Sequence, residues 1–458
     1  MRKNRRISWL LLSLSIPGWA QSDTAALKAI LERLERLEQQ NRTLTDEVQS
    51  LRNQLSARDA TTQATPPVVP VEERLAVQET RVEELAQTKV EASQKLPLSL
   101  TGMLLFNAYM NGRYNGGNDN PTVASLNPVP RNAGGTFRQT ILGLKFQSPR
   151  TVFGAEVNGS LYMDFFANLA NNVNPDRAIS GNLNRLMRLR IATVELDWES
   201  TSLLFGQEKP IISPREPMSL SHVGVSPLTN AGNPWLWQPQ VRLEQRFRFS
   251  ATTNLSAQIG VFQTAEASQN VSEALAATLE SSRPALQGRF ALRHEIGEDR
   301  HIEIAPSFHT SSTHVAGTSV PSRVYSIDWS IAPLPKLGFT GMFYGGQNTA
   351  NLGTLRPGFT VLGPGRVIAT HSLGGWAQIS YAATQRVTLN IFGGQHDDRD
   401  SDLRANAIGK NFAYAGNALY RIAPNVIFAF EVMQLRTNYV GAGRRLNNHY
   451  DLALAYQF

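Results

Sequence analysis

The sequence predicts an all-β transmembrane barrel of about 16 antiparallel strands, preceded by an N-terminal α-helical coiled coil. Alternating apolar and polar residues after residue 98, an alternation of short and long connections, and a heptad repeat before residue 57 all point to this fold. Charged residues make up only 18% of the 458 residues, which is low for a soluble chain of this size. No run of 18 apolar residues is present, so membrane-spanning helices are not expected.

Residues 1–20 are expected to be a secretory signal peptide. Four basic residues precede the apolar stretch 7–16, and Ala20 ends a segment that a signal peptidase would cut. A membrane-anchoring helix is the alternative, but so short a stretch cannot cross a hydrocarbon core of about 30 Å. Loss of those four residues lowers the formal charge from +7 to +3, so no nucleic-acid partner is expected. The chain has no cysteine, which excludes disulfides and thiolate sites.

Residues 21–56 are expected to form a periplasmic coiled coil, since apolar residues recur there with 3,4 spacing. A lone amphipathic helix packed on the barrel is the alternative. A Pro-containing linker is predicted at 57–70, a second helical segment at 71–97, and the barrel at 98–458. The two core positions of the coiled coil are Leu27, Leu34, Asn41, Val48 and Leu55, and Ile30, Leu37, Leu44 and Leu51.

The barrel prediction depends on period-2 segments of about membrane-spanning length. In 152–166, apolar and polar residues alternate over about a dozen positions, which is the pattern of a tilted membrane strand. A soluble β-sandwich is the alternative, but its inner faces would not collect so many charges. The expected strands start near residues 98, 136, 152, 186, 201, 240, 253, 285, 301, 323, 336, 366, 385, 410, 424 and 445. Seven short turns alternate with eight longer connections, as in a barrel with short periplasmic turns and long external loops.

The last nine residues, 450–458, carry an apolar or aromatic group at every second position and end on Phe458. This pattern resembles the carboxy-terminal assembly signal of bacterial outer-membrane proteins. The expected location is therefore the bacterial outer membrane, with lipid and lipopolysaccharide around the barrel. An even number of strands places both ends of the barrel, and the coiled coil, in the periplasm.

Charged side chains on the polar face of such a barrel line its lumen, because a charge facing lipid near the midplane costs roughly 2–4 kcal/mol. One interpretation of the inward arginines is a basic ladder that attracts anions. The other is a wall braced by arginine–carboxylate pairs, with Glu156, Asp164, Glu244 and Asp328 as partners; both can hold at once. The arginines are Arg188, Arg190, Arg242, Arg246, Arg248, Arg289 and Arg293.

Residues 185–208 (RLMRLRIATVELDWESTSLLFGQE) resemble the R-L-R-x-A-x-V-E-L … G-Q pattern of the DcaP-like porins and of phosphate-selective porins. The signal peptide, coiled coil and terminal phenylalanine agree with that family. The resemblance implies a homotrimer that takes up small anionic solutes such as dicarboxylates. It places the basic constriction at Arg188 and Arg190, and less securely at Arg242 and Arg246. Thr193 departs from the family pattern, which leaves the choice of substrate open.

The third long connection, 208–238, is the longest and is rich in Pro, Ser, Gly and Trp. Third loops of general porins fold into the pore, which makes Lys209, Arg215 and Glu216 candidates for a constriction. An external loop packed on a neighbouring subunit is the alternative.

No catalytic residue, metal site or cofactor is expected. The eight histidines are scattered without a serine or carboxylate constellation, and the acidic run 396–402 lacks the glycine and glutamate of a calcium loop. The predicted function is a porin forming a water-filled channel for small anions. The alternative is a structural barrel or tether whose coiled coil is the functional part.

Overall fold

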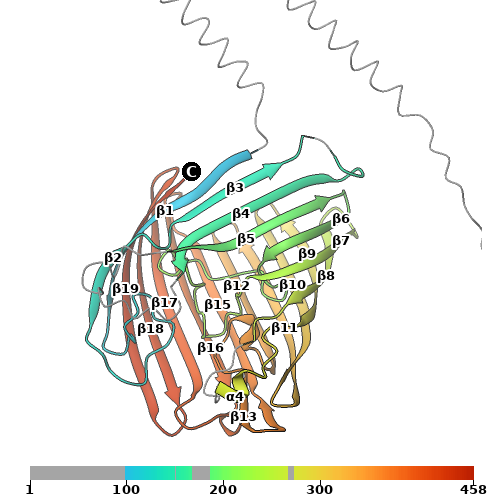
Figure 1. Ribbon diagram of the computed structural model, residues 1–458. Helices are drawn as coiled ribbons and strands as arrows, with labels where there is room; N and C mark the ends of the chain where they lie inside the picture. Colours follow the sequence, from blue (N-terminus) through green and yellow to red (C-terminus); the bar gives the residue numbers. More distant parts are fainter. Residues whose placement is uncertain (1–97, 150, 168–185, 267–272) are drawn as a thin grey trace, which may run out of the picture. The chain divides into compact units, whose positions relative to one another are not determined.

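The computed structural model describes residues 98–149, 151–167, 186–266 and 273–458. The predicted signal peptide, coiled coil, linker and second helical segment fall in residues 1–97, outside the described ranges. The described residues form one antiparallel β-barrel (Figure 1). The strands of its wall are β1 (Leu98–Asn111), β2 (Asn132–Thr136), β3 (Ile141–Gln147), β4 (Glu156–Ala167), β5 (Leu186–Asp197), β6 (Thr201–Glu208), β7 (Gln238–Arg248), β8 (Thr253–Gln263), β9 (Pro284–Gly297), β10 (Arg300–Val315), β11 (Thr318–Leu334), β12 (Leu337–Gln347), β15 (His371–Ala382), β16 (Val387–Asp398), β17 (Ile408–Ala423), β18 (Val426–Tyr439) and β19 (Gly443–Gln457).

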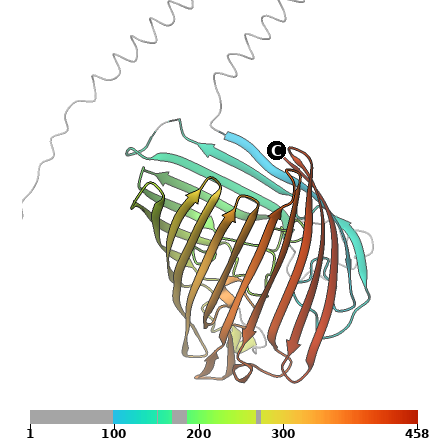
Figure 2. The same ribbon diagram turned by 180° about the vertical axis from the view of Figure 1, so that it is seen from behind.

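These segments occupy sixteen positions around the barrel, as predicted. Both β2 and β3 pair with β1, at its second and first half respectively, so they are two parts of one interrupted strand. At the interruption, the Thr140 hydroxyl accepts a hydrogen bond from the Leu105 amide (3.1 Å) and takes the place of a backbone partner. Every other wall strand pairs with its neighbours along the chain, and β1 pairs with β19 to close the cylinder (Figure 2).

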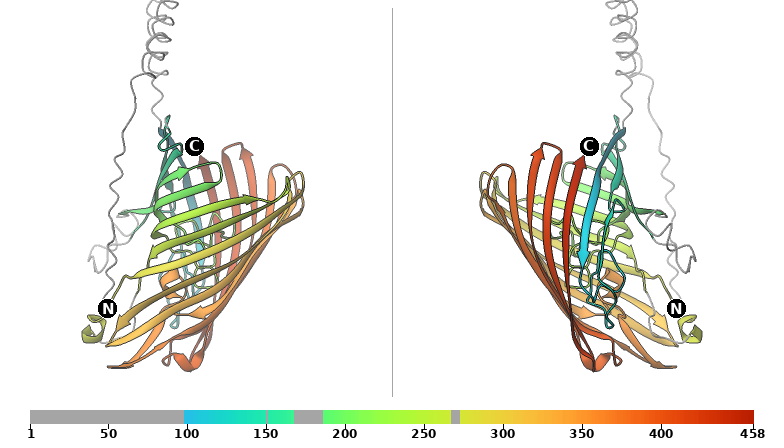
Figure 3. Two further views of the ribbon diagram at one scale, coloured as in Figure 1. Left: turned by 90° about the vertical axis from the view of Figure 1, so that its right-hand side faces the viewer. Right: turned by 90° about the vertical axis from the view of Figure 1, so that its left-hand side faces the viewer.

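The connections alternate between two ends of the barrel. The short-turn end carries the turns between β5 and β6, β7 and β8, and so on to β17 and β18, together with both ends of the barrel chain (Figure 1). The long-loop end carries the extended connections, of which 209–237 is the longest with all its residues described. The strands are strongly tilted, as Figure 3 shows, which a closed barrel requires.

Two connections predicted to be long are short. Residues 316–317 and 440–442 are tight turns, because β10, β11, β18 and β19 continue beyond their predicted ends. Serine, threonine and histidine made the stretch around 309–322 look like a loop. In the structure these residues pair across the hairpin, for example through the hydroxyls of Ser312 and Ser319 (2.7 Å). A strand can carry polar residues on both faces there, because these strands extend beyond the length that spans a membrane.

The strand predicted to start near residue 366 is the wall strand β15, which begins later, at His371. Residues Arg366–Ala369 form β14, which pairs with β13 (Phe359–Gly363) in a separate hairpin at the long-loop end (Figure 1). The wall resumes at His371. The remaining small elements are α4 (Glu273–Ala276), η1 (Ala350–Leu352) and η2 (Asp400–Asp402). No helix within the described ranges is long and apolar enough to cross a membrane.

The two faces of the wall differ as the period-2 pattern predicts. On β19, Leu452, Leu454 and Tyr456 project outward and are exposed, whereas Asp451 and Ala453 project inward and are buried. Successive residues of a strand point to opposite faces, so one register sorts the apolar side chains to the outside of every strand.

Phe458 closes the barrel together with Gly102. The Gly102 amide donates to the Phe458 carbonyl (3.0 Å), and the Phe458 amide donates to the Gly102 carbonyl (3.2 Å). A Cβ at position 102 would clash with the Ile141 carbonyl and touch the Phe458 ring at 2.9 Å. The absence of a side chain at Gly102 therefore lets three strands and the terminal aromatic ring meet at the seam.

Gly102→Ala should destabilise the barrel at this seam. Overpacking of this kind costs about 1–3 kcal/mol. The barrel should therefore unfold at a lower urea concentration, which can be followed on gels of unheated samples, where folded and unfolded protein migrate differently. Gly338→Ala is the matched control, because no atom lies within 4 Å of a Cβ built there. Equal urea midpoints for the two variants would show that the seam can accommodate a methyl group at position 102.

Candidate functional site

Residues 209–237, here called the inner loop, fold into the lumen. At one side, the Asn107 side-chain amide on β1 donates to the Leu220 carbonyl of the loop (2.8 Å). At the other, Arg215 of the loop forms ion pairs with Asp328 on β11 and with Glu303 on β10. Because β1 and β11 lie on nearly opposite sides of the sixteen-position wall, the loop crosses the lumen. The alternative prediction, an external loop that packs on a neighbouring subunit, is wrong.

The inner loop packs against one side of the wall through apolar side chains. Ile212, Leu228 and Ala231 of the loop form a buried cluster with inward residues of β11, β12 and β15 to β18. Two glycines allow the closest approach. A Cβ on Gly394 of β16 would clash with the Ala231 carbonyl. Gly232 has φ +100° and lies against the backbone of β15 and β16, where a side chain would clash. The loop therefore narrows the lumen from this side.

A balanced ionic cluster holds the loop to β9, β10 and β11. Arg289 donates to Asp328 through Nε (2.8 Å) and contacts Glu303 through Nη2 (2.9 Å). Arg215 of the loop contacts the same two carboxylates, with Nη2 2.6 Å from Glu303. Arg293 completes the cluster, 2.6 Å from Glu295 and 3.5 Å from Glu303. Three guanidinium groups thus face three carboxylates, and the cluster carries little net charge.

A second group of polar residues holds the loop to β1, β18 and β19. Ser219 of the loop donates to Glu431 (2.6 Å), and the Ser221 hydroxyl lies 2.9 Å from Nε2 of His449. His222 is buried next to them, with Nδ1 3.7 Å from Glu431, and its ring makes an edge contact with that of His449. Within the described part of the chain, neither ring nitrogen of His222 has a hydrogen-bond partner. Ion pairs therefore hold the loop to β9, β10 and β11, and hydrogen bonds hold it to β1, β18 and β19.

The two arginines of the sequence motif meet the end of the inner loop. Arg188 and Arg190 on β5 share Asp164 of β4, at 2.6 and 2.9 Å from Oδ2. Arg188 also donates to the Gly224 carbonyl, and both guanidinium groups lie over the Trp237 ring, 5.1 and 4.5 Å from its centroid. The pairing with Asp164 is the one that the brace interpretation predicts.

Arg138 extends this group, and sequence reasoning did not single it out. Its guanidinium pairs with Asp119 and lies 3.8 Å from the centroid of the Phe166 ring, which Arg188 also approaches (5.2 Å). Arg138, Arg188 and Arg190 therefore form one group of arginines around Asp119, Asp164 and the Phe166 ring. Arg138 lies between β2 and β3, where the second strand position is interrupted, and its side chain points inward.

The three arginines of β7 line the lumen toward the short-turn end. Arg246 lies 2.5 Å from Asp197 and 3.8 Å from Glu244. In the part of the chain that the structure describes, the side chains of Arg242 and Arg248 form no hydrogen bond or ion pair. Arg242 is half-buried and Arg248 is exposed. This strand therefore presents positive charge that no carboxylate neutralises.

Lys209 and Glu216 pair with each other within the inner loop, at 2.9 Å. Desolvation of the Glu216 carboxyl opposes its ionisation, but the charge of Lys209 and a hydrogen bond from Ser226 (2.5 Å) outweigh this effect. The pKa of Glu216 is accordingly held below its ordinary value. Since 35% of its side chain remains exposed, the pair contributes only modestly to stability.

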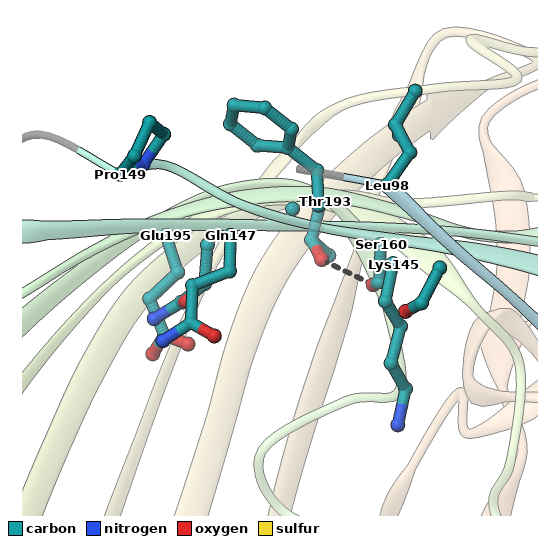
Figure 4. Close-up of a pocket in the computed structure, with 11 residues that line it drawn as sticks. Leu98, Lys145, Gln147, Pro149, Ser160, Thr193 and Glu195 are labelled. Carbon is teal, nitrogen blue, oxygen red and sulfur yellow. Dashed lines mark hydrogen bonds between the residues drawn. The ribbon is translucent and has the colours of Figure 1, made fainter. Parts of the chain in front are cut away.

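A cavity of about 800 Å³ opens at the short-turn end, along the inner face of β3, β4 and β5. Figure 4 shows Lys145, Gln147 and Glu195 pointing to the same side of the sheet, with the Ser160–Thr193 hydrogen bond (2.7 Å) between them. The lining combines polar side chains with Leu98, Phe146 and Pro149, and it includes no residue of the inner loop. This part of the lumen therefore remains open to solvent.

The wall residues that seat the inner loop were mostly missed from the sequence. The sequence points to Asp164, Glu244 and Asp328 as partners, but not to Glu303, Glu431 or His449. Glu156 makes no ion pair within the described ranges. Strand parity does not single these residues out, because polar residues are expected at every inward position of a polar lumen.

Gly394→Ala should push the inner loop away from the wall and toward the open lumen. The added methyl group meets the Ala231 carbonyl, so we expect a loss of about 1–3 kcal/mol in stability and a fall in single-channel conductance. Gly416→Ala on the neighbouring strand is the control, because the nearest atom to its Cβ is 3.7 Å away. An unchanged conductance in Gly394→Ala would mean that the loop does not set the width of the lumen.

Glu216→Gln should make the lumen more anion-preferring at neutral pH, because it leaves Lys209 without its partner. The native carboxylate, with its depressed pKa, stabilises the loop above the ordinary glutamate range and loses that contribution as the pH falls through its own pKa. Reversal potentials of native protein and variant should therefore differ at neutral pH and converge in acid. Lys209→Gln should shift the potential in the opposite direction; a shift in the same direction would rule out the pair as its cause.

Comparison with known proteins identifies the fold. No family model and no curated protein matches the sequence. Among solved structures, the outer membrane channel DcaP of Acinetobacter baumannii is similar with a TM-score of 0.62 and 17% identity, over 79% of this chain and 97% of that one. The anion-selective porin from Comamonas acidovorans has a TM-score of 0.50 and 9% identity, over 79% and 99%. The expected likeness to DcaP is thus confirmed at the level of the fold, and the described chain is a β-barrel of the bacterial outer-membrane porin type.

Proposed function

We propose that this protein is an outer-membrane channel for passive uptake of small anionic solutes such as dicarboxylates. One observation carries the proposal: the inner loop crosses the lumen of a closed barrel whose inner face presents Arg242 and Arg248, which pair with no carboxylate among the described residues. A loop that narrows a polar lumen creates a place where fixed charge acts on a passing ion at close range.

Arginines gather in two places. Arg188 and Arg190 share Asp164 beside the inner loop. Arg242, Arg246 and Arg248 lie nearer the short-turn end, where Arg246 pairs with Asp197 and Glu244 and also lies near Glu195. The cluster around Arg289 is balanced and supports the loop. Guanidinium groups suit carboxylates and phosphates because their donors form a planar fork. The Comamonas porin, which is anion-selective, has a similar fold and adds support.

The assembly and orientation complete the proposal. The even strand number places the start of β1 and the C-terminus at the short-turn end, which we assign to the periplasm. The predicted coiled coil would then lie in the periplasm, and we propose a homotrimer surrounded by outer-membrane lipid and lipopolysaccharide. No cofactor takes part in passive diffusion.

The test is single-channel conductance of the purified oligomer in planar bilayers, with reversal potentials under a salt gradient and with added succinate. We expect anion preference and block by succinate. Arg242→Gln should reduce the anion preference without loss of folding, because the Arg242 side chain has no partner among the described residues. Thr252→Val, in an exposed turn, is the control. Cation preference in the native protein would contradict the proposal.

A structural barrel is the second candidate, because the buried apolar cluster between the inner loop and the wall fills part of the lumen. A folded oligomer that gives no conductance at any voltage would favour it.

A further inference from the structure

A groove of about 620 Å³ lies on the outer face of the wall near the long-loop end, across β11, β12, β15 and β16. Gly345 forms its floor and pairs with Tyr325 on one side and with Leu373 on the other. Both neighbours project outward and are 73% and 57% exposed. Since Gly345 has no side chain between two large ones, the three positions create a furrow. We call it the outer groove.

Two arginines border the outer groove at the end nearer the long loops. Arg323 pairs in register with Gln347 and Gln347 with His371, whose carbonyl accepts a hydrogen bond from the Arg399 amide (2.9 Å). Arg323 and Arg399 are exposed, and neither guanidinium forms a hydrogen bond or ion pair with the residues that the structure describes.

Several other ionisable side chains around the outer groove have partners of their own. His371 lies 2.9 Å from Asp402, and Lys410 lies 2.9 Å from Asp397. Asp398 projects inward, where it binds His396 and Ser372. Asp402 also lies near Arg399, but neither Arg323 nor Arg399 makes an ion pair with a described carboxylate, so both guanidinium groups keep their donors available at the groove.

The opposite end of the outer groove leads into apolar surface. Phe343 on β12, Ile379 on β15 and Ile391 on β16 project outward and are 53%, 47% and 69% exposed. The outer groove thus crosses the boundary between the apolar band of the wall and its charged rim. In a barrel that spans a membrane, this boundary is the depth at which head groups meet acyl chains.

We propose that the outer groove binds a phosphorylated lipid of the outer leaflet, with a phosphate between Arg323 and Arg399. An acyl chain lies along Gly345, between Tyr325 and Leu373. Arginine pairs with phosphate through two parallel hydrogen bonds, and it is more weakly hydrated than lysine, so it suits a site at the edge of the hydrocarbon. A second copy of the chain would bury two arginines that have no ion-pair partner on this face among the described residues. This proposal rests on the proposed location in the outer membrane and not on conduction.

The test measures retention of diphosphoryl lipid A by delipidated protein in detergent, using native mass spectrometry. Each arginine near a charged lipid surface contributes enough that replacing both should weaken binding about thirty-fold. Arg323→Gln/Arg399→Gln should therefore lose most of the bound lipid. Gly345→Leu should fill the furrow and weaken binding as well. Its Cβ would meet only the flexible end of Leu373, at 2.9 Å, so the variant should fold. Arg366→Gln, on the separate hairpin, is the matched control and should bind as the native protein does.

Three results would overturn the proposal. One is equal retention by native protein and the double variant, and another is equal affinity for lipid A with its phosphates removed. The third is full displacement by excess inorganic phosphate, which would indicate an anion site without lipid specificity. Conductance recorded from the same samples separates this proposal from the proposed function. Lipid retained by a protein that does not conduct supports the groove and not the channel, and conductance without retained lipid does the reverse.

Discussion

The whole structure depends on closure of the wall between β1 and β19. In hydrocarbon, an unpaired backbone N–H or C=O finds no water, so a membrane sheet is stable only when its edges pair with each other. Nine residues of β1 pair with β19, and Phe458 adds two further hydrogen bonds at Gly102. Closure sets the register of every strand, and the register decides which side chains face lipid and which face the lumen.

The position of the inner loop follows from that sorting. A loop rich in proline, glycine and serine makes few hydrogen bonds of its own, and buried backbone groups need partners. The inward side chains of the wall supply them. Gln139 accepts from the Val223 and Gly224 amides (2.8 Å each), and Asn417 donates to the Met218 carbonyl (2.8 Å). The polar inner face therefore has two roles: it holds the loop on one side of the lumen and stays exposed on the other.

The wall could be predicted well from the sequence, because lipid-facing and lumen-facing residues alternate along every strand of a closed barrel. The starts at 98, 186, 201 and 253 coincide with observed strands, whereas the strand predicted from near 366 begins at 371, after a hairpin outside the wall. Contacts of the inner loop could not be predicted, because they join residues far apart in the chain. Ser221 and His449 are 228 positions apart, and no local pattern relates them. Gly394 illustrates the same limit, because a side chain at this position would clash with the inner loop that packs on it.

The pairing of the arginines changes which of them can act on a solute. A ladder inferred from parity alone treats all seven alike, yet Arg190 and Arg289 are buried beneath the loop and serve as braces. Arg188 keeps 26% of its side chain exposed, and Arg246 and Arg293 keep 37% and 36%. A paired guanidinium still has donors free, because one carboxylate occupies at most two of its five N–H groups. The two interpretations can therefore hold for the same residues, because one guanidinium group can pair with a carboxylate of the wall and donate to a solute in the lumen. Arg242 has no ion-pair partner among the described residues, so its charge acts on the lumen directly.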